Sequence, residues 1–367
     1  MAAAPRILVA PLDWGLGHAT RCVPIIEEIR RQGGAVAVGA AGGALAYLKA
    51  EFPGLEFVNL PAYNIRYYWE NMFWNIGVQA PGLLRAIWRE HRQVQQVIRR
   101  LNIDAVISDS RFGCFSPHIP SIFVTHQLHI QIPSPPLQGL ANRLNHWFIR
   151  QYGECWIPDV PGPGSLSGTL SFPWNPAGES GPSGKIRHIG ILSRLQPEEG
   201  EKEYDILALL SGPEPQRSRL ESALIGQLSA LPYRVLLAQG LPGREKRCRP
   251  APHIEVVSFL NARELRHALG RSALVICRPG YSTAMDMAAM GKKALFIPTP
   301  GQTEQEYLAR RLQRLGYCPC QNQNELDVKK GVLDAGSYAG FPKYDREEAR
   351  LIAAVKSLMG RIAPWPG

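Results

Sequence analysis

The chain has 367 residues, of which 45% are hydrophobic and 20% charged, a composition that is typical of a folded globular protein and excludes a largely disordered one. Its 41 lysines and arginines against 31 aspartates and glutamates give a formal net charge of +10, with local bunching at 85–100 and 244–249, so an anionic partner has to be considered. No run approaches the roughly 18 apolar residues of a membrane span, and no zinc-finger, helix-turn-helix or RNA-binding signature occurs, so we expect no nucleic-acid partner.

The first half of the sequence alternates short apolar strands with amphipathic helices. Strands are expected at 7–10, 35–39, 104–108 and 121–125, and helices at 20–32, 45–51 and 83–101. Such alternation is typical of a parallel sheet covered by helices.

A segment rich in proline, glycine and serine, 158–183, separates this half from a second alternating set. Strands are expected at 205–210, 234–238, 254–257, 273–277 and 293–297, and helices at 218–230, 262–269, 282–290, 304–315 and 345–359. We therefore predict an α/β chain with two Rossmann-like domains, 1–188 and 189–345, followed by a terminal helix and tail, 346–367. Open parallel sheets bind ligands at the carboxyl ends of their strands, so a cleft between the two domains is the expected site.

The first strand leads into a glycine-bearing turn, Asp13-Trp-Gly-Leu-Gly-His18. This turn lacks the third glycine of a dinucleotide fingerprint and the acidic residue that would hold a ribose, so a hydride-transfer enzyme is not expected. Gly17 and His18 are expected where the turn enters a helix, a context that suits anion binding. His18 there could act as a general base or merely cap the turn.

Two further polar residues follow neighbouring strands. Asp109 comes directly after 104–108 and His126 after 121–125, so both should lie at the carboxyl edge of the first sheet with His18. Asp109 could orient the His18 ring and stabilise its charged form, or it could cap the next turn. His126 could contact an acceptor or serve as a second base.

The most specific pattern runs from Cys277 to Leu308. The strand 273–277 leads into Arg278-Pro-Gly-Tyr-Ser-Thr283 and a helix that carries Asp286. Small residues at a helix start let a phosphate approach backbone N–H groups, and Asp286 could bond a ribose diol or be an acid favoured by the helix dipole. The next strand is followed by a helix that opens with Glu304 and Gln305, whose polar groups suit sugar hydroxyls.

This pattern, Arg278-x-Gly280-x-Ser282-Thr283-x-x-Asp286 followed by Pro298 and Gln305-x-Tyr307, resembles the donor-binding half of two-domain (GT-B) nucleotide-sugar glycosyltransferases. The likeness is greatest to the lipid-linked N-acetylglucosaminyltransferase of peptidoglycan synthesis and its uncharacterised relatives. The opening segment 11–21 is similar to the glycine turn and histidine of their acceptor half. The resemblance implies two domains facing each other across a cleft, with the terminal helix packing back on the first.

The resemblance also implies roles for the donor-side residues. Asp286 would hold the ribose and Gln305 the sugar, while the usual second glutamine is Glu306 and the usual later asparagine is Ala309, which leaves the sugar open. The other residues implied in donor binding are Gly17, Ser211, Gly212, Phe259, Leu260, Arg278, Gly280, Ser282, Thr283 and Glu304.

The implied activity is transfer of a sugar from a UDP-sugar, similar to UDP-GlcNAc, to the hydroxyl of a lipid-linked or small-molecule acceptor. The sequence has no Asp-x-Asp metal anchor, so the Gly280 turn, the helix dipole and Arg278 are expected to meet the charge of the leaving diphosphate. We expect no metal and no cofactor besides the UDP-sugar, and an inverting displacement with His18 as base. A UDP-sugar epimerase of the same fold and a non-catalytic nucleotide-sugar-binding module are the alternatives.

Six aromatic residues lie within the twelve residues 63–74, against 8% aromatic residues in the whole chain. They are Tyr63, Tyr67, Tyr68, Trp69, Phe73 and Trp74, and they are flanked by Arg66, Arg85, Trp88, Arg89 and Arg92. Aromatic and basic residues together suit the headgroup boundary of an anionic membrane. The alternatives are that these rings pack in the core of the first domain or line an acceptor groove. In the groove, Tyr68 and Trp69 would touch the acceptor. Seven scattered cysteines and no visible secretion signal indicate a cytoplasmic protein, here expected on the inner face of the membrane.

Overall fold

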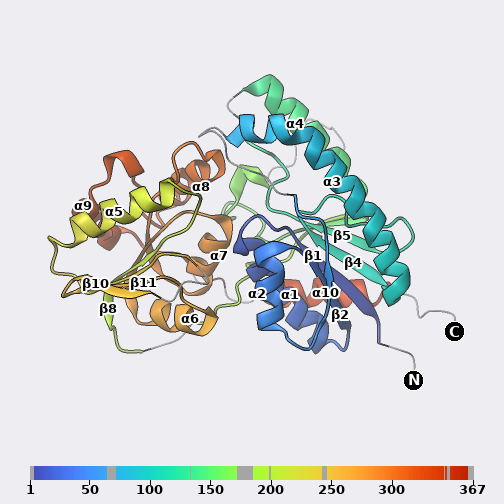
Figure 1. Ribbon diagram of the computed structural model, residues 1–367, viewed down its shortest axis with the longest axis horizontal. Helices are drawn as coiled ribbons and strands as arrows, with labels where there is room; N and C mark the ends of the chain where they lie inside the picture. Colours follow the sequence, from blue (N-terminus) through green and yellow to red (C-terminus); the bar gives the residue numbers. More distant parts are fainter. Residues whose placement is uncertain are drawn as a thin grey trace. The chain divides into compact units, whose positions relative to one another are not determined.

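The computed structural model divides the chain into two compact units (Figure 1). Unit 1 contains Met1–Trp69, Phe73–Arg194 and Asp345–Gly367, and unit 2 contains Glu70–Met72 and Leu195–Tyr344. The structure describes residues 4–63, 72–132, 134–171, 185–197, 200–241, 246–342, 344 and 348–362, without the side chains of 72–78 and 185.

In the described part of unit 1, seven strands form one sheet in the order β3-β2-β1-β4-β5-β6-β7, and every neighbouring pair is parallel. The strands are β1 Arg6–Pro11, β2 Ala35–Ala40, β3 Glu56–Asn59, β4 Ala105–Asp109, β5 Ser121–Val124, β6 Glu154–Ile157 and β7 Lys185–His188. β1, β2, β4 and β5 confirm the apolar runs that the sequence singled out. The sequence analysis did not select the other three strands, each of which begins with a charged residue.

The helices of unit 1 are α1 Leu16–Arg31, α2 Gly42–Glu51, α3 Met72–Leu101, α4 Pro135–Ile149 and α10 Glu348–Met359, with a 3₁₀ turn, η1, at Gly168–Leu170. Figure 1 shows α3 on one side of the sheet and α1, α2 and α10 together on the other. The terminal helix α10 packs on α1, and the Gln32 side-chain amide donates to the carbonyl of Ile352 at 3.0 Å. The expected return of this helix to the first half is confirmed.

The sheet of unit 2, as far as its residues are described, has the order β10-β11-β9-β8-β12-β13, in which β10 is antiparallel to its neighbour and the other pairs are parallel. Its strands are β8 Tyr204–Leu209, β9 Val235–Ala238, β10 Arg247–Ala251, β11 Ile254–Val257, β12 Ser272–Cys277 and β13 Lys293–Phe296. Its helices are α5 Gln216–Leu228, α6 Ala262–Gly270, α7 Tyr281–Ala289, α8 Thr303–Arg314 and α9 Val328–Ser337, with a 3₁₀ turn, η2, at Gln323–Glu325.

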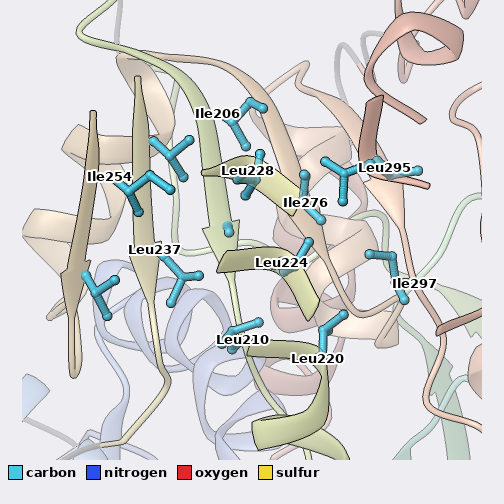
Figure 2. Packing of buried hydrophobic residues seen from close by; sticks show 14 residues of the cluster. Ile206, Leu210, Leu220, Leu224, Leu228, Leu237, Ile254, Ile276, Leu295 and Ile297 are labelled. Carbon is cyan, nitrogen blue, oxygen red and sulfur yellow. The ribbon is translucent and has the colours of Figure 1, made fainter. Parts of the chain in front are cut away.

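The core of unit 2 follows directly from two sequence periods. Alternate residues of β8 point to one face of the sheet, and Leu220, Leu224 and Leu228 recur every four residues along α5, so both sets meet in one buried cluster (Figure 2). Full burial of each leucine contributes about 1.5–3 kcal/mol to the hydrophobic term. This packing holds the carboxyl end of β8 at Leu210, where the donor-side loops begin.

The basic run near residue 247 becomes an edge strand. β10 pairs with β11, and Arg247 and Arg249 both form ion pairs with Glu255, at 3.1 and 3.7 Å. Charged residues on an edge strand discourage pairing with another chain, so this bunching of charge has a structural explanation.

Candidate active site

The topological switch point of unit 1 lies between β1 and β4. The chain after β1 continues to strands on one side and the chain after β4 to strands on the other, and the register pairs Pro11 with Asp109. The loops that leave such a point diverge and open a crevice at the carboxyl edge of the sheet. Leu12 N–H donates to the Asp109 carbonyl at 2.9 Å, which ties the glycine turn to this edge before α1 begins at Leu16.

His18, Asp109 and His126 come together here, as the sequence predicts. Nδ1 of His18 lies 3.2 Å from Oδ1 of Asp109, which is fully buried, whereas 18% of the His18 side chain is exposed. Arg21, one turn after His18 on α1, completes the cluster: its Nε donates to Asp109 Oδ2 at 2.6 Å and its Nη1 lies 3.2 Å from Nδ1 of His126. The sequence analysis missed Arg21, although its three-residue spacing from His18 places both side chains on one helix face.

The protonation of this cluster follows from burial and from Arg21. Burial alone would raise the pKa of Asp109, but the charges of Arg21 and then His18 outweigh it and hold the pKa well below its usual range. Burial lowers the pKa of His18, and Arg21 lowers it further, while Asp109 offsets only part of this. At neutral pH the site therefore holds an ionised Asp109 beside an uncharged His18.

A buried network fixes the loop that follows Asp109. Arg111 Nε donates to Glu90 Oε1 at 2.5 Å and its Nη1 to the Pro11 carbonyl at 3.3 Å, while Glu90 Oε2 accepts from the Tyr63 hydroxyl at 2.7 Å. Tyr63 is thus a core residue, which corrects its assignment to a surface aromatic segment. Tyr68 and Trp69, the predicted acceptor contacts, lie outside the described residues, as do Arg66 and Tyr67 and the side chains of Phe73 and Trp74.

The switch point of unit 2 lies between β8 and β12, whose ends are paired at Leu209 and Cys277. β8 leads to Ser211 and Gly212, both exposed, and Gly212 adopts a left-handed φ of 101°. β12 leads through the Gly280 N-cap into α7. The two predicted phosphate-facing turns therefore leave adjacent strands of one sheet.

The start of α7 presents a polar face. Ser282, Thr283 and Asp286 are half-buried, while the helix residues between them are buried against the unit. A helix start with small residues and hydroxyl groups favours an anion. Thr299, which the sequence analysis did not select, is close to this point: a Cβ on Gly212 would lie 3.7 Å from its hydroxyl oxygen, a buried atom without a hydrogen-bond partner in the described part of the chain.

The structure does not direct the Arg278 guanidinium toward a ligand at this turn. Its side chain is 1% exposed and donates to the carbonyls of Ile297, Pro298 and Gln216 and to the side chain of Gln323. Burial lowers its pKa to about 10. A guanidinium buried beneath the turn holds the loop carbonyls in place and has no exposed N–H for a ligand.

The remaining donor-side residues have mixed environments. Gln305 is buried, and its side-chain oxygen accepts a hydrogen bond from Thr299 N–H at 2.8 Å, which holds the turn before α8. Glu304 is half-buried at the start of that helix. Phe259 is 37% exposed just after β11, and Leu260 lines a cavity of about 800 Å³ along α6. Their contacts with sugar and base stay predictions.

Residues 237–357 match the glycosyltransferase family 28 C-terminal domain. A UDP-N-acetylglucosamine–N-acetylmuramyl-(pentapeptide) pyrophosphoryl-undecaprenol N-acetylglucosamine transferase of Nocardioides sp. is 38% identical over 97 residues, 24% of this chain and 25% of that protein. An uncharacterized glycosyltransferase of Methanosarcina acetivorans is 25% identical over 339 residues, 85% of this chain and 82% of that protein.

Among solved structures, the calicheamicin glycosyltransferase CalG4 shares the fold with a TM-score of 0.66 at 14% identity, covering 98% of this chain and 100% of that one. The chain is a glycosyltransferase of the GT-B fold. In this glycosyltransferase the matched family domain contains the α7 face, Arg278 and Gln305, whereas Ser211, Gly212 and the His18 cluster lie before it.

Proposed function

We propose that this glycosyltransferase moves a sugar from a UDP-sugar, similar to UDP-GlcNAc, to the hydroxyl of a lipid-linked acceptor by an inverting displacement that needs no metal. The names of the relatives support a UDP-sugar donor and a lipid-linked acceptor. The observation that carries the proposal is the pair of switch points, one with a histidine beside a buried carboxylate and one where two glycine turns leave adjacent strands, one of them into the polar start of α7.

On the donor side, the diphosphate lies against the backbone of the Gly280 and Gly212 turns, and Asp286 accepts hydrogen bonds from the ribose hydroxyls. The α7 dipole and backbone N–H groups stabilise the negative charge that builds up as the bond from the anomeric carbon to the diphosphate breaks. Buried Arg278 adds positive charge beneath the turn without touching the phosphates.

On the acceptor side, His18 removes the proton of the acceptor hydroxyl as its oxygen attacks the anomeric carbon. The new bond forms on the face opposite to the leaving UDP, so the anomeric configuration inverts. Ionised Asp109 stabilises the imidazolium that results, since it is buried beside the ring and cannot be screened by water.

Product analysis after incubation with UDP-sugars and a lipid extract tests the proposal and separates the alternatives. A transferase releases UDP only when acceptor is present, an epimerase makes a second UDP-sugar without releasing UDP, and a binding module does neither. We expect His18→Ala to lower turnover by about two to four orders of magnitude with UDP binding retained. His118→Ala, which alters an exposed histidine of the same unit, is the control and should keep full activity. Full activity in His18→Ala would refute the base assignment.

A membrane role is supported by an apolar stripe that the sequence analysis did not find. Leu137, Leu140, Leu144 and Trp147 recur along one face of α4 with 38%, 57%, 52% and 57% exposure. Leu84 and Trp88 of α3 are exposed too, while neighbouring residues of both helices share one buried cluster. Across the described ranges, no helix has both the length and the apolar character needed to cross a bilayer.

We propose that this stripe docks the enzyme on the anionic cytoplasmic membrane surface, where a lipid-linked acceptor is presented. The charge pattern fits such a partner: Arg92 lies over the Trp88 ring at 4.8 Å, and Arg85, Arg89 and Arg143 lie on the same two helices. Apolar side chains bury at the headgroup boundary, and each nearby arginine adds about 1 kcal/mol of attraction to anionic lipid.

Co-sedimentation with anionic and neutral liposomes over a salt series tests this docking. We expect wild type to sediment with anionic vesicles at low salt, and the triple variant Leu140→Ser, Leu144→Ser, Trp147→Ser to stay in the supernatant. Leu333→Ser removes an equally exposed leucine from α9 of unit 2 and should sediment like wild type. Equal sedimentation of wild type and the triple variant would refute the α4 surface.

A further inference from the structure

Arg21 lies at the centre of the cluster in unit 1. Its guanidinium is 2% exposed and donates to both carboxylate oxygens of Asp109. The same group reaches Nδ1 of His18 at 2.8 Å from Nη2, and Nδ1 of His126 at 3.2 Å from Nη1. One buried cation thus contacts all three ionisable residues that the sequence placed at this sheet edge.

These contacts determine where the ring protons lie. A guanidinium only donates hydrogen bonds, so a ring nitrogen that faces it has to present a lone pair. Nδ1 of His18 is closer to Arg21 Nη2, at 2.8 Å, than to Asp109 Oδ1, at 3.2 Å, and a proton on Nδ1 would point toward a second donor. The proton of the neutral His18 ring therefore belongs on Nε2.

Arg21 also changes the charge balance around His18. Asp109 without a partner would strongly stabilise an imidazolium, but the two-point contact with Arg21 offsets part of this stabilisation. The groups that face His18 are Arg21 from α1, Asp109 from β4 and His126 from the segment after β5, while the Cys22 thiol faces Asp109. Burial raises the pKa of the Cys22 thiol well above its usual value, so this group stays uncharged.

We propose that Arg21 is a positioning residue that keeps His18 uncharged and decides which ring nitrogen carries the proton. This inference rests on the proposed role of His18 as the base. To accept a proton at Nε2, the ring has to give its Nε2 proton to water and take a proton from water at Nδ1, with no net change in charge. Nδ1 then gives up its contact with Arg21 and donates to Asp109 Oδ1, which is already within reach. Arg21 thus favours the tautomer with the proton on Nε2 in the absence of substrate, and Asp109 favours the tautomer with the proton on Nδ1 that can accept a proton at Nε2.

Nitrogen NMR of the full chain labelled with ¹⁵N-histidine tests the resting state, because the two ring nitrogens distinguish the charged ring and both neutral tautomers. The His18 signal is assigned by its loss in His18→Gln. At about pH 7.5 we expect an uncharged ring with the proton on Nε2. An imidazolium, or a neutral ring protonated on Nδ1, would overturn the proposal.

Arg21→Met tests the cause, because it leaves Asp109 as the main charge that faces His18. We expect a charged His18 ring in this variant at about pH 7.5, and an acid limb of kcat/KM that moves upward by about one pH unit or more. Arg30→Met removes an exposed arginine of the same helix and should change neither. An uncharged His18 in Arg21→Met would contradict the proposal.

If Arg21→Met does not fold, the wild-type spectrum still decides, since it needs no variant of Arg21. The spectrum also needs no substrate. A wrong tautomer with normal UDP release would refute the role of Arg21 alone, and the expected tautomer without any UDP release would refute the transfer alone.

Discussion

Substitution of Asp286 gives the most direct test of the proposed donor site. It is half-buried on the polar face of α7, one turn from the helix start. We expect Asp286→Ala to weaken UDP binding by about ten- to a hundredfold, because a hydrogen bond to a carboxylate contributes about 1.5–3 kcal/mol. Titration calorimetry measures this, with Asp334→Ala on α9 as the matched acidic control. Unchanged affinity in Asp286→Ala would leave this residue as a helix-start charge only.

Glu90 differs from surface carboxylates because its partner, Arg111, is fully buried. Glu90→Gln keeps the shape but removes the closer of two counter-charges, since Arg111 then retains only Asp13, whose Oδ1 lies 3.6 Å from Nη1. We expect a loss of up to about 3–5 kcal/mol in the free energy of unfolding. Arg31→Ala breaks the Glu28–Arg31 pair, in which the arginine is 60% exposed, and should cost less than about 1 kcal/mol. Urea unfolding measures both, and similar losses in the two variants would contradict the burial argument.

At the residue scale, sequence reasoning works where position on a strand decides the outcome. His18, Asp109 and His126 meet because each follows a parallel strand, and strand ends are visible in the apolar pattern. Sequence reasoning does not predict the direction of the Arg278 side chain, because the sequence around a phosphate turn is the same whether a basic residue points to the ligand or beneath the loop. Only the four acceptors around Arg278 show its direction.

At the element scale, the donor-side loop depends on a close approach between two strands. A Cβ on Gly240, which follows β9 with φ 69°, would lie 2.3 Å from the Leu210 carbonyl oxygen. We expect Gly240→Ala to displace the end of β8, and to lower both UDP affinity and the stability of unit 2. Gly291→Ala is the control, since Gly291 has a similar φ of 58° but no atom within 4 Å, and strain alone costs about 1 kcal/mol. Calorimetry with UDP and urea unfolding compare the two, and equal effects would show that only strain matters.

The elements that sequence reasoning found are those with a strong apolar period, and the missed ones have a physical reason. α4 carries its large apolar residues on the exposed side, so its pattern does not mark a core-facing helix. β10 is a polar edge strand whose pairing with β11 is antiparallel, which βα alternation does not predict. Such elements are specified by neighbours in space and not by their own sequence.

At the scale of the whole molecule, unit 1 should lose stability as the pH falls, at pH values above those at which carboxylates become protonated. Burial lowers the pKa of His18, His129 and His188, all in unit 1, so the unfolded chain binds more protons than the folded one as the pH falls through about 6.5. Stability is lost in that window, with an upper limit of about 1.4 kcal/mol per pH unit for each histidine, and less for the two half-buried ones. Asp109 acts at lower pH: its contribution to stability is complete above the usual carboxylate pKa and is lost as the pH falls from there toward its depressed pKa.

Tryptophan fluorescence isolates this effect, because all eight tryptophans belong to unit 1. We expect the urea midpoint of this signal to fall steadily between about pH 7.5 and pH 5.5. The double variant His18→Gln, His129→Gln removes two of the three proton sites, so its midpoint should change less over the same range, whatever its absolute stability. A wild-type midpoint that stays constant over this range would mean that the three histidines titrate alike in the folded and unfolded chain, and burial would then not be what keeps His18 uncharged.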